Sequence, residues 1–157
     1  MAGGRVRRPG GAGTAAGALN VVDTSVLVSS LVRGDEFHLR SFAWLGARVV
    51  EHEQLTIPSL ALPELAGVLA RRGWGHAAAV ASVRHVMENQ RLRVIGVDTA
   101  LAESAADVAS ACRLKGTDAV FVALARLLDV PLVTWDREMR DRGGAVADVR
   151  DPNDWGV

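Results

Sequence analysis

Aromatic residues are scarce in this sequence of 157 residues, which has no tyrosine, three phenylalanines and four tryptophans. A protein that stacks single-stranded bases on an aromatic surface usually carries more of them. Lysine is almost absent too, since Lys115 is the only lysine among eighteen cationic residues, and eighteen acidic residues balance them. Without net charge the protein has no global field that attracts a polyanion. Any affinity for nucleic acid must therefore come from local clusters of charge.

Cysteine is limited to Cys112, which excludes a disulfide within the chain and a zinc site built from several cysteines. The four histidines lack the spacing of a familiar metal-binding motif, and no apolar run has the length of a membrane span. Residues 1–18 contain arginines but lack the apolar stretch of a signal peptide. We therefore expect a flexible tail over residues 1–18, one domain over residues 19–157, no membrane association and a cytoplasmic location.

The apolar pattern predicts an α/β fold, because short β-branched runs alternate with longer stretches at helical spacing. Strands are expected over residues 19–22, 54–57, 92–97, 131–134 and 145–149. Helices are expected over residues 24–32, 35–48, 76–89, 117–128 and 137–142. One further helix is expected to end near residue 72, and another to begin after residue 98. This alternation predicts a central, mostly parallel sheet of four or five strands that helices cover on both faces.

Four acidic residues follow strands or open helices in this pattern: Asp23, Glu64, Asp118 and Asp136. In open parallel sheets ligands collect at the carboxyl ends of the strands, so the four side chains can converge on one edge. Carboxylates gathered beside an apolar core repel one another, and Mg²⁺ or Mn²⁺ is the natural partner of an all-oxygen cluster. The arrangement therefore indicates a metal-dependent nuclease.

Each acid also has an ordinary structural explanation. Asp23 suits a helix N-cap, and Asp118 suits the positive end of a helix dipole. Asp136 fits a cap or a turn, and Glu64 fits the solvated face of an amphipathic helix. Because Pro63 lacks an N–H group, the helix that carries Glu64 either begins close to Pro63 or bends in its first turn.

The order and context of these acids resemble those of the PIN-domain ribonucleases, most closely the VapC-type toxins of bacterial toxin–antitoxin pairs. The similar segments are VVDTSVLVSSL, PSLALPELAGVLARR, KGTDAVFVALARLLDVPLVTWDREMRDR and the closing DPNDW. They span roughly Leu19 to Trp155 and imply a PIN-like fold.

The resemblance also implies roles for single residues. The resemblance assigns catalysis to four residues, Asp23, Glu64, Asp118 and Asp136. It assigns metal coordination to the three aspartates among them. Thr134 and Ser25 take supporting positions beside the site, although Ser25 also suits a helix cap.

The implied activity is hydrolysis of a structured cellular RNA, such as tRNA or rRNA, by water that Mg²⁺ or Mn²⁺ activates. Four cations beside the acidic segments are expected to contact RNA, with solvated surface charge as the alternative for each: Arg113, Lys115, Arg137 and Arg140. A cognate antitoxin and a homodimer are the expected partners. Apolar residues near 37–49 and 61–69 offer a groove to an antitoxin helix, or else fill the core or a dimer interface.

Three other functions remain compatible with parts of the pattern. The first is a PIN nuclease that matures RNA without an antitoxin. The second is a PIN-like scaffold that binds RNA or protein without cutting it, although a scaffold has no reason to maintain a repulsive acidic cluster. The third is a haloacid-dehalogenase-like phosphatase, which requires a second aspartate where this sequence has Ser25.

Overall fold

The computed structural model describes residues 19–155, so the predicted tail over residues 1–18 lies outside the described residues. The centre is a five-stranded sheet in the order β3-β2-β1-β4-β5, and every neighbouring pair is parallel. The strands are β1 (Leu19–Val22), β2 (Gln54–Pro58), β3 (Leu92–Ile95), β4 (Leu132–Val133) and β5 (Val149–Arg150). The predicted parallel α/β architecture is confirmed.

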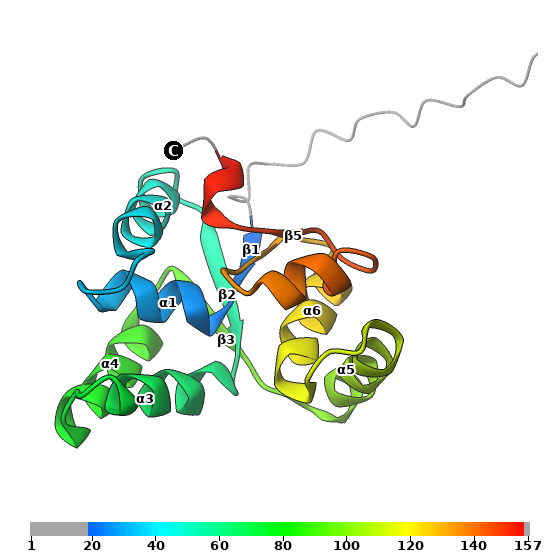
Figure 1. Cartoon of the computed structure of the whole chain (residues 1–157), viewed down its shortest axis with the longest axis horizontal. Helices are drawn as coiled ribbons and strands as arrows, with labels where there is room; N and C mark the ends of the chain where they lie inside the picture. The colour runs from blue at the N-terminus through cyan, green and yellow to red at the C-terminus, as the bar shows by residue number, and fades with distance from the viewer. Residues whose placement is uncertain (1–18, 156–157) are drawn as a thin grey trace, which may run out of the picture.

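Helices cover both faces of the sheet, with α1 to α4 on one side and α5 and α6 on the other (Figure 1). The helices are α1 (Thr24–Leu31), α2 (His38–Val50), α3 (Ala61–Arg71), α4 (His76–Glu88), α5 (Thr99–Cys112), α6 (Gly116–Leu128), a π-helix η1 (Met139–Gly143) and a 3-10 helix η2 (Pro152–Trp155). No helix in the described part of the chain is long and apolar enough to cross a membrane.

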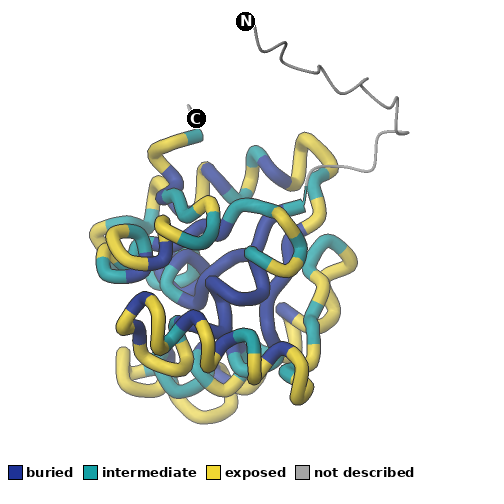
Figure 2. The backbone as a smooth tube through the Cα atoms, turned by 90° about the vertical axis from the view of Figure 1, so that its right-hand side faces the viewer, coloured by how far each residue is buried: buried dark blue, intermediate teal, exposed yellow. Residues whose placement is uncertain are grey.

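The core lies between these layers, where the backbone in the middle of the molecule is buried (Figure 2). Val21 and Val22 of β1 are fully buried, and α6 is buried along its length from Ala119 to Ala125 because β1 and β2 pack against it on one side and α5 on the other. A strand or helix that is enclosed on both sides consists of a nearly continuous run of apolar residues. The apolar pattern of the sequence therefore predicted the positions of β1 and α6 well.

Several predicted element boundaries were wrong, among them the helix expected over residues 137–142, which is the π-helix Met139–Gly143, and the strand expected over residues 131–134, which is only Leu132–Val133. The helix expected over residues 35–48 begins at His38, because the Asp35 carboxylate accepts a hydrogen bond from the Phe37 N–H and holds a turn. The strand expected over residues 145–149 is only Val149–Arg150, because the chain turns back on the Gly143 carbonyl after the π-helix. The strand expected over residues 92–97 ends at Ile95.

Strand order places a topological switch point between β1 and β4. From β1 the chain proceeds to β2 and β3 on one side, and then crosses by α5 and α6 to reach β4 on the other side of β1. Connections diverge at such a point, and this leaves a crevice beyond the carboxyl ends of the two strands. Asp23 directly follows β1 and Asp136 lies just beyond β4, so both carboxylates stand at this crevice.

Candidate active site

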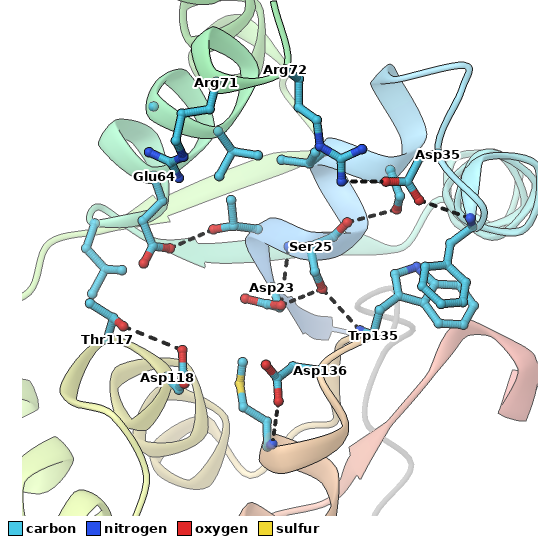
Figure 3. A pocket seen from close by; sticks show the side chains of 18 of the residues that line it. Asp23, Ser25, Asp35, Glu64, Arg71, Arg72, Thr117, Asp118, Trp135 and Asp136 are labelled. Atoms are coloured by element: carbon cyan, nitrogen blue, oxygen red, sulfur yellow. Dashed lines mark hydrogen bonds and ion pairs between the residues drawn. The ribbon is translucent and has the colours of Figure 1, made fainter.

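A cavity of about 780 Å³ opens at the carboxyl edge of the sheet. Its walls come from the start of α1, the loop before α2, one face of α3, the first turn of α6 and the segment after β4. All four acids singled out in the sequence line it: Asp23, Glu64, Asp118 and Asp136. Figure 3 shows their carboxylates around one common space, which we call the acidic cavity.

Asp23 is buried at the base of the acidic cavity, with 6% of its surface exposed. One of its carboxylate oxygens, Oδ2, accepts hydrogen bonds from the Ser25 N–H at 3.2 Å, the Ser25 hydroxyl at 2.5 Å and the Thr134 hydroxyl at 2.8 Å. No side-chain donor from the described part of the chain reaches Oδ1. Asp23 is therefore both the N-cap of α1, as its ordinary explanation holds, and a fixed carboxylate with one oxygen available to a ligand.

Ser25 and Thr134 connect Asp23 to the segment that carries Asp136. The Thr134 hydroxyl donates to Asp23 and accepts from the Asp136 N–H at 2.9 Å, while the Ser25 hydroxyl accepts from the Trp135 N–H at 3.1 Å. Thr134 is fully buried behind the cavity, and Ser25 lines it. Both hydroxyl residues therefore contact Asp23 and link the end of β1 to the segment after β4, and their supporting role in catalysis stays a prediction.

The other three acids are held less firmly. Glu64 Oε2 accepts from the Thr24 hydroxyl at 2.9 Å, and Asp136 Oδ1 accepts from the Met139 N–H at 2.8 Å. Among the described residues, the one hydrogen-bond contact of the Asp118 carboxylate is with the hydroxyl of its neighbour Thr117, at 3.5 Å. All three are half-buried and line the cavity, with fewer hydrogen bonds than Asp23.

Pro63 is compatible with a straight start to α3. The helix begins at Ala61, so Pro63 occupies its third position, where the N–H of any residue lacks a partner within the helix. The missing donor therefore costs nothing, and Glu64 points into the acidic cavity from the first turn (Figure 3).

The electrostatics of the cavity disfavour its charged form. Burial is the main cause that raises the pKa of Asp23 above its ordinary value, despite its hydrogen bonds. Burial also raises the pKa of Glu64 and of Asp118, and the negative charges of neighbouring cavity acids raise both further. The carboxylates are thus close enough to repel one another, and a cation bound among them would relieve that repulsion.

The donor set suits a hard divalent cation, since carboxylate and hydroxyl oxygens are the ligands that Mg²⁺ prefers. As the side chains lie, however, no three acidic, histidine or cysteine residues between positions 19 and 155 are close enough together to hold one ion. Binding would require the half-buried carboxylates of Glu64, Asp118 and Asp136 to turn toward Asp23, or water to bridge the gaps. The coordination roles assigned to the aspartates therefore stay predictions.

The four cations predicted to contact RNA do not line the acidic cavity. Arg140 is paired with Asp151, and the exposed Arg137 is paired with Asp141. Arg113 ends α5, while Lys115 precedes α6 and is near enough to lower the pKa of Asp118, although burial and the other acids outweigh it. These residues lie outside the cavity, and their contact with RNA stays a prediction.

Two other arginines, which the sequence analysis did not single out, line the cavity instead: Arg71 and Arg72 at the end of α3. Arg72 forms a 3.1 Å ion pair with Asp35. The Arg71 guanidinium lies 3.3 Å from the point where a side chain would begin on Gly67, so it extends back along α3 toward Glu64 (Figure 3). Arg71 comes seven residues after Glu64, about two helical turns, which places both side chains on the same face of α3. That spacing could have predicted from the sequence that the two residues lie close together.

Comparison with known protein families identifies the fold. The model of the PIN domain matches residues 21–145, most of the chain. The chain belongs to the PIN-domain family. No curated protein matches this PIN domain.

Solved structures agree with this fold. The Mycobacterium tuberculosis toxin VapC20, described as cleaving the sarcin–ricin loop, is 23% identical with a TM-score of 0.70, over 83% of this chain and 98% of that one. A chain of a toxin–antitoxin complex from Klebsiella pneumoniae is 22% identical with a TM-score of 0.62, over 87% and 98%. A chain of DNA-bound VapBC from Salmonella typhimurium is 18% identical with a TM-score of 0.65, over 86% and 98%.

Proposed function

We propose that this PIN domain is an endoribonuclease that depends on a divalent metal ion. The observation that carries the proposal is the convergence of four carboxylates, from segments far apart in the sequence, on one cavity at the switch point of the sheet. A phosphatase of the haloacid-dehalogenase type is not favoured, because it requires a second aspartate two positions after Asp23, where this chain has Ser25. The Ser25 hydroxyl instead donates to Asp23 and accepts from the Trp135 N–H.

Bound Mg²⁺ or Mn²⁺ would offset the charge of the phosphodiester and lower the pKa of the attacking water. Asp23, Asp118 and Asp136 are the residues that would hold the ion. Asp23 is suited to anchor it, because three hydrogen bonds fix Oδ2 while no side chain of the described residues donates to Oδ1. Glu64, held by the Thr24 hydroxyl across the cavity, would orient the water.

Arg71 is the cation best placed to hold the RNA backbone. It lines the cavity beside Glu64 and forms no ion pair with the described residues, so its guanidinium can bind a phosphate bidentately. Arg72 already neutralises Asp35 and stabilises the cavity rim.

We further infer that the chain is the toxin of a toxin–antitoxin pair, acts in the cytoplasm on a structured RNA such as tRNA or rRNA, and forms a homodimer. Support comes from the toxin–antitoxin complexes among its structural neighbours and from an exposed apolar face on α2. Leu39, Phe42 and Val50 are 79%, 66% and 78% exposed on that face. By contrast, Leu65 and Leu69 of α3 are buried and fill the core.

The proposal predicts that purified protein cuts a defined bond in tRNA or rRNA when Mg²⁺ or Mn²⁺ is present and not in excess EDTA. Cut ends would be mapped by primer extension, with and without the products of the genes adjacent to this one. If an adjacent gene encodes the proposed antitoxin, we expect that protein to bind tightly and stop cleavage. Full cleavage in EDTA would exclude the metal, absence of cleavage would favour a binding scaffold, and cleavage that no neighbouring gene product inhibits would favour an RNA-processing nuclease.

A further inference from the structure

Two aromatic side chains form one wall of the acidic cavity. Phe37, in the loop before α2, stacks on Trp135, in the segment after β4, with ring centroids 4.2 Å apart and an angle of 11° between the ring planes. Both residues are half-buried and line the same cavity as the four carboxylates. The scarcity of aromatics in the sequence predicts recognition of the RNA backbone, yet the fold gathers two of them beside the reactive centre.

Trp135 is held rigidly at both its backbone and its ring. Its N–H donates to the Ser25 hydroxyl, and its indole N–H donates to the Ser41 hydroxyl at 2.7 Å. The Ser41 hydroxyl then donates to Ser29 at 2.6 Å, and the Ser29 hydroxyl donates to the Ser25 carbonyl at 2.8 Å. Because the Ser29 hydroxyl donates its hydrogen to a carbonyl, Ser41 is the donor between the two hydroxyls. Ser29 and Ser41 are both buried, and their hydrogen bonds fix the indole relative to Asp23.

Phe37 is held from the opposite wall. Asp35 accepts from the Phe37 N–H at 3.0 Å through one carboxylate oxygen, and from Arg72 of α3 at 3.1 Å through the other. The loop that carries Phe37 is therefore tied across the rim of the cavity to the end of α3 (Figure 3). An aromatic pair fixed from two sides needs little further ordering when a planar ligand binds.

We propose that the Phe37–Trp135 pair is a stacking surface for one nucleobase of the RNA whose phosphate enters the acidic cavity. This inference rests on the proposed ribonuclease function and specifies its substrate as RNA with an unpaired base beside the scissile phosphate. The cavity of about 780 Å³ has the size of a site for an organic ligand, much more than a hydrated ion needs. Bases inside an RNA helix cannot reach an aromatic side chain, whereas bases in loops and bulges can be splayed out onto one.

The other aromatic residues have different surroundings, which makes the pair distinctive. Trp44 packs edge-on against Trp155, Phe121 is buried in the core, Trp74 packs against the core, and Phe42 is exposed on α2 outside the cavity. Phe42 therefore provides a matched control, since it has the same side chain on the helix that follows Phe37.

The test uses a short single-stranded RNA that contains 2-aminopurine, whose fluorescence falls when the base stacks. Binding is measured in Mg²⁺ in the Asp118→Asn background, which prevents cleavage and leaves the contacts of Trp135 untouched. Fluorescence should fall on binding, and Phe37→Leu should abolish this quenching and weaken affinity roughly tenfold, the scale of one lost stacking contact. Phe37→Tyr should preserve both, and Phe42→Leu should change neither. The same strand annealed to its complement should bind without quenching.

Two results would overturn the inference: quenching and affinity unchanged in Phe37→Leu, or paired RNA bound as tightly as the single strand. Thermal melting of each variant separates a loss of stacking from a loss of fold, and the comparison of single-stranded with paired RNA, made without any change at Phe37, decides the matter if Phe37→Leu unfolds. Cleavage by the unsubstituted protein is measured in parallel on tRNA and rRNA in Mg²⁺. Quenching on the single strand with no cleavage of either RNA would contradict the ribonuclease proposal alone, and cleavage of one of them together with no effect of Phe37→Leu on the strand would contradict the stacking surface alone.

Discussion

Asp23→Asn and Asp118→Asn are each expected to lower the rate of RNA cleavage by more than about a hundredfold. Even a residue that only supports a metal ligand contributes about tenfold to a hundredfold, and these two are assigned to the ion itself. Each substituted side chain would have one oxygen fewer and no charge, so the ion would be held more weakly and the phosphate less well neutralised. Initial cleavage rates in saturating Mg²⁺ give the measurement.

Both variants should keep the fold. An asparagine at position 23 can still accept the Ser25 and Thr134 hydrogen bonds through its side-chain oxygen, and the Asp118 carboxylate has only its contact with Thr117 to lose. Asp129→Asn is the matched control, because it makes the same chemical change outside the cavity at a left-handed position that asparagine tolerates. Variants at positions 23 and 118 that stay folded and cut RNA at the control rate would refute the catalytic assignment.

The second large effect is on stability without metal. In EDTA at neutral pH, Asp118→Asn should melt a few degrees above the unsubstituted protein, because it removes one charge from a repulsive cluster. The pKa of Asp118 is raised in the folded state, chiefly by burial and then by Asp136 and Asp23. A carboxyl group with a raised pKa favours the folded state below its ordinary pKa of about 4, and this contribution disappears as pH rises through the folded value.

The difference in melting temperature should therefore shrink as the pH is lowered toward about 4, because the raised pKa makes Asp118 take up a proton more readily in the folded protein than in the unfolded chain. Saturating Mg²⁺ or Mn²⁺ should reverse the order at neutral pH, since the ion stabilises the intact cluster more than the substituted one. Thermal melts of the two proteins and of Asp129→Asn, with and without metal, provide the data. A lower melting temperature for Asp118→Asn in EDTA at neutral pH would show that the cluster is not repulsive.

Strand-end positions made much of the site predictable from sequence. Asp23 and Asp136 follow short buried strands, and the carboxyl ends of parallel strands meet at one edge. Asp118 and Glu64 open helices that begin at that edge. The resemblance added the supporting roles of Ser25 and Thr134, which the structure places in contact with Asp23.

The cations and the aromatic wall were harder to predict. Arg137 and Arg140 were chosen because they follow Asp136 in sequence, but successive helical residues point in different directions, and both pair with nearby acids. The stack between Phe37 and Trp135 depends on a loop and a strand end from opposite parts of the chain. No local sequence pattern around either residue predicts such a contact, because only the folded sheet brings the two segments together.

The carboxylates of the acidic cavity should bind one divalent metal ion between them. Anomalous diffraction from crystals grown with Mn²⁺ locates the ion without reference to activity. We expect a manganese peak inside the cavity, within coordinating distance of Asp23 and at least one of Asp118 and Asp136. Fully occupied crystals with manganese only at the molecular surface, and none between these side chains, would contradict it.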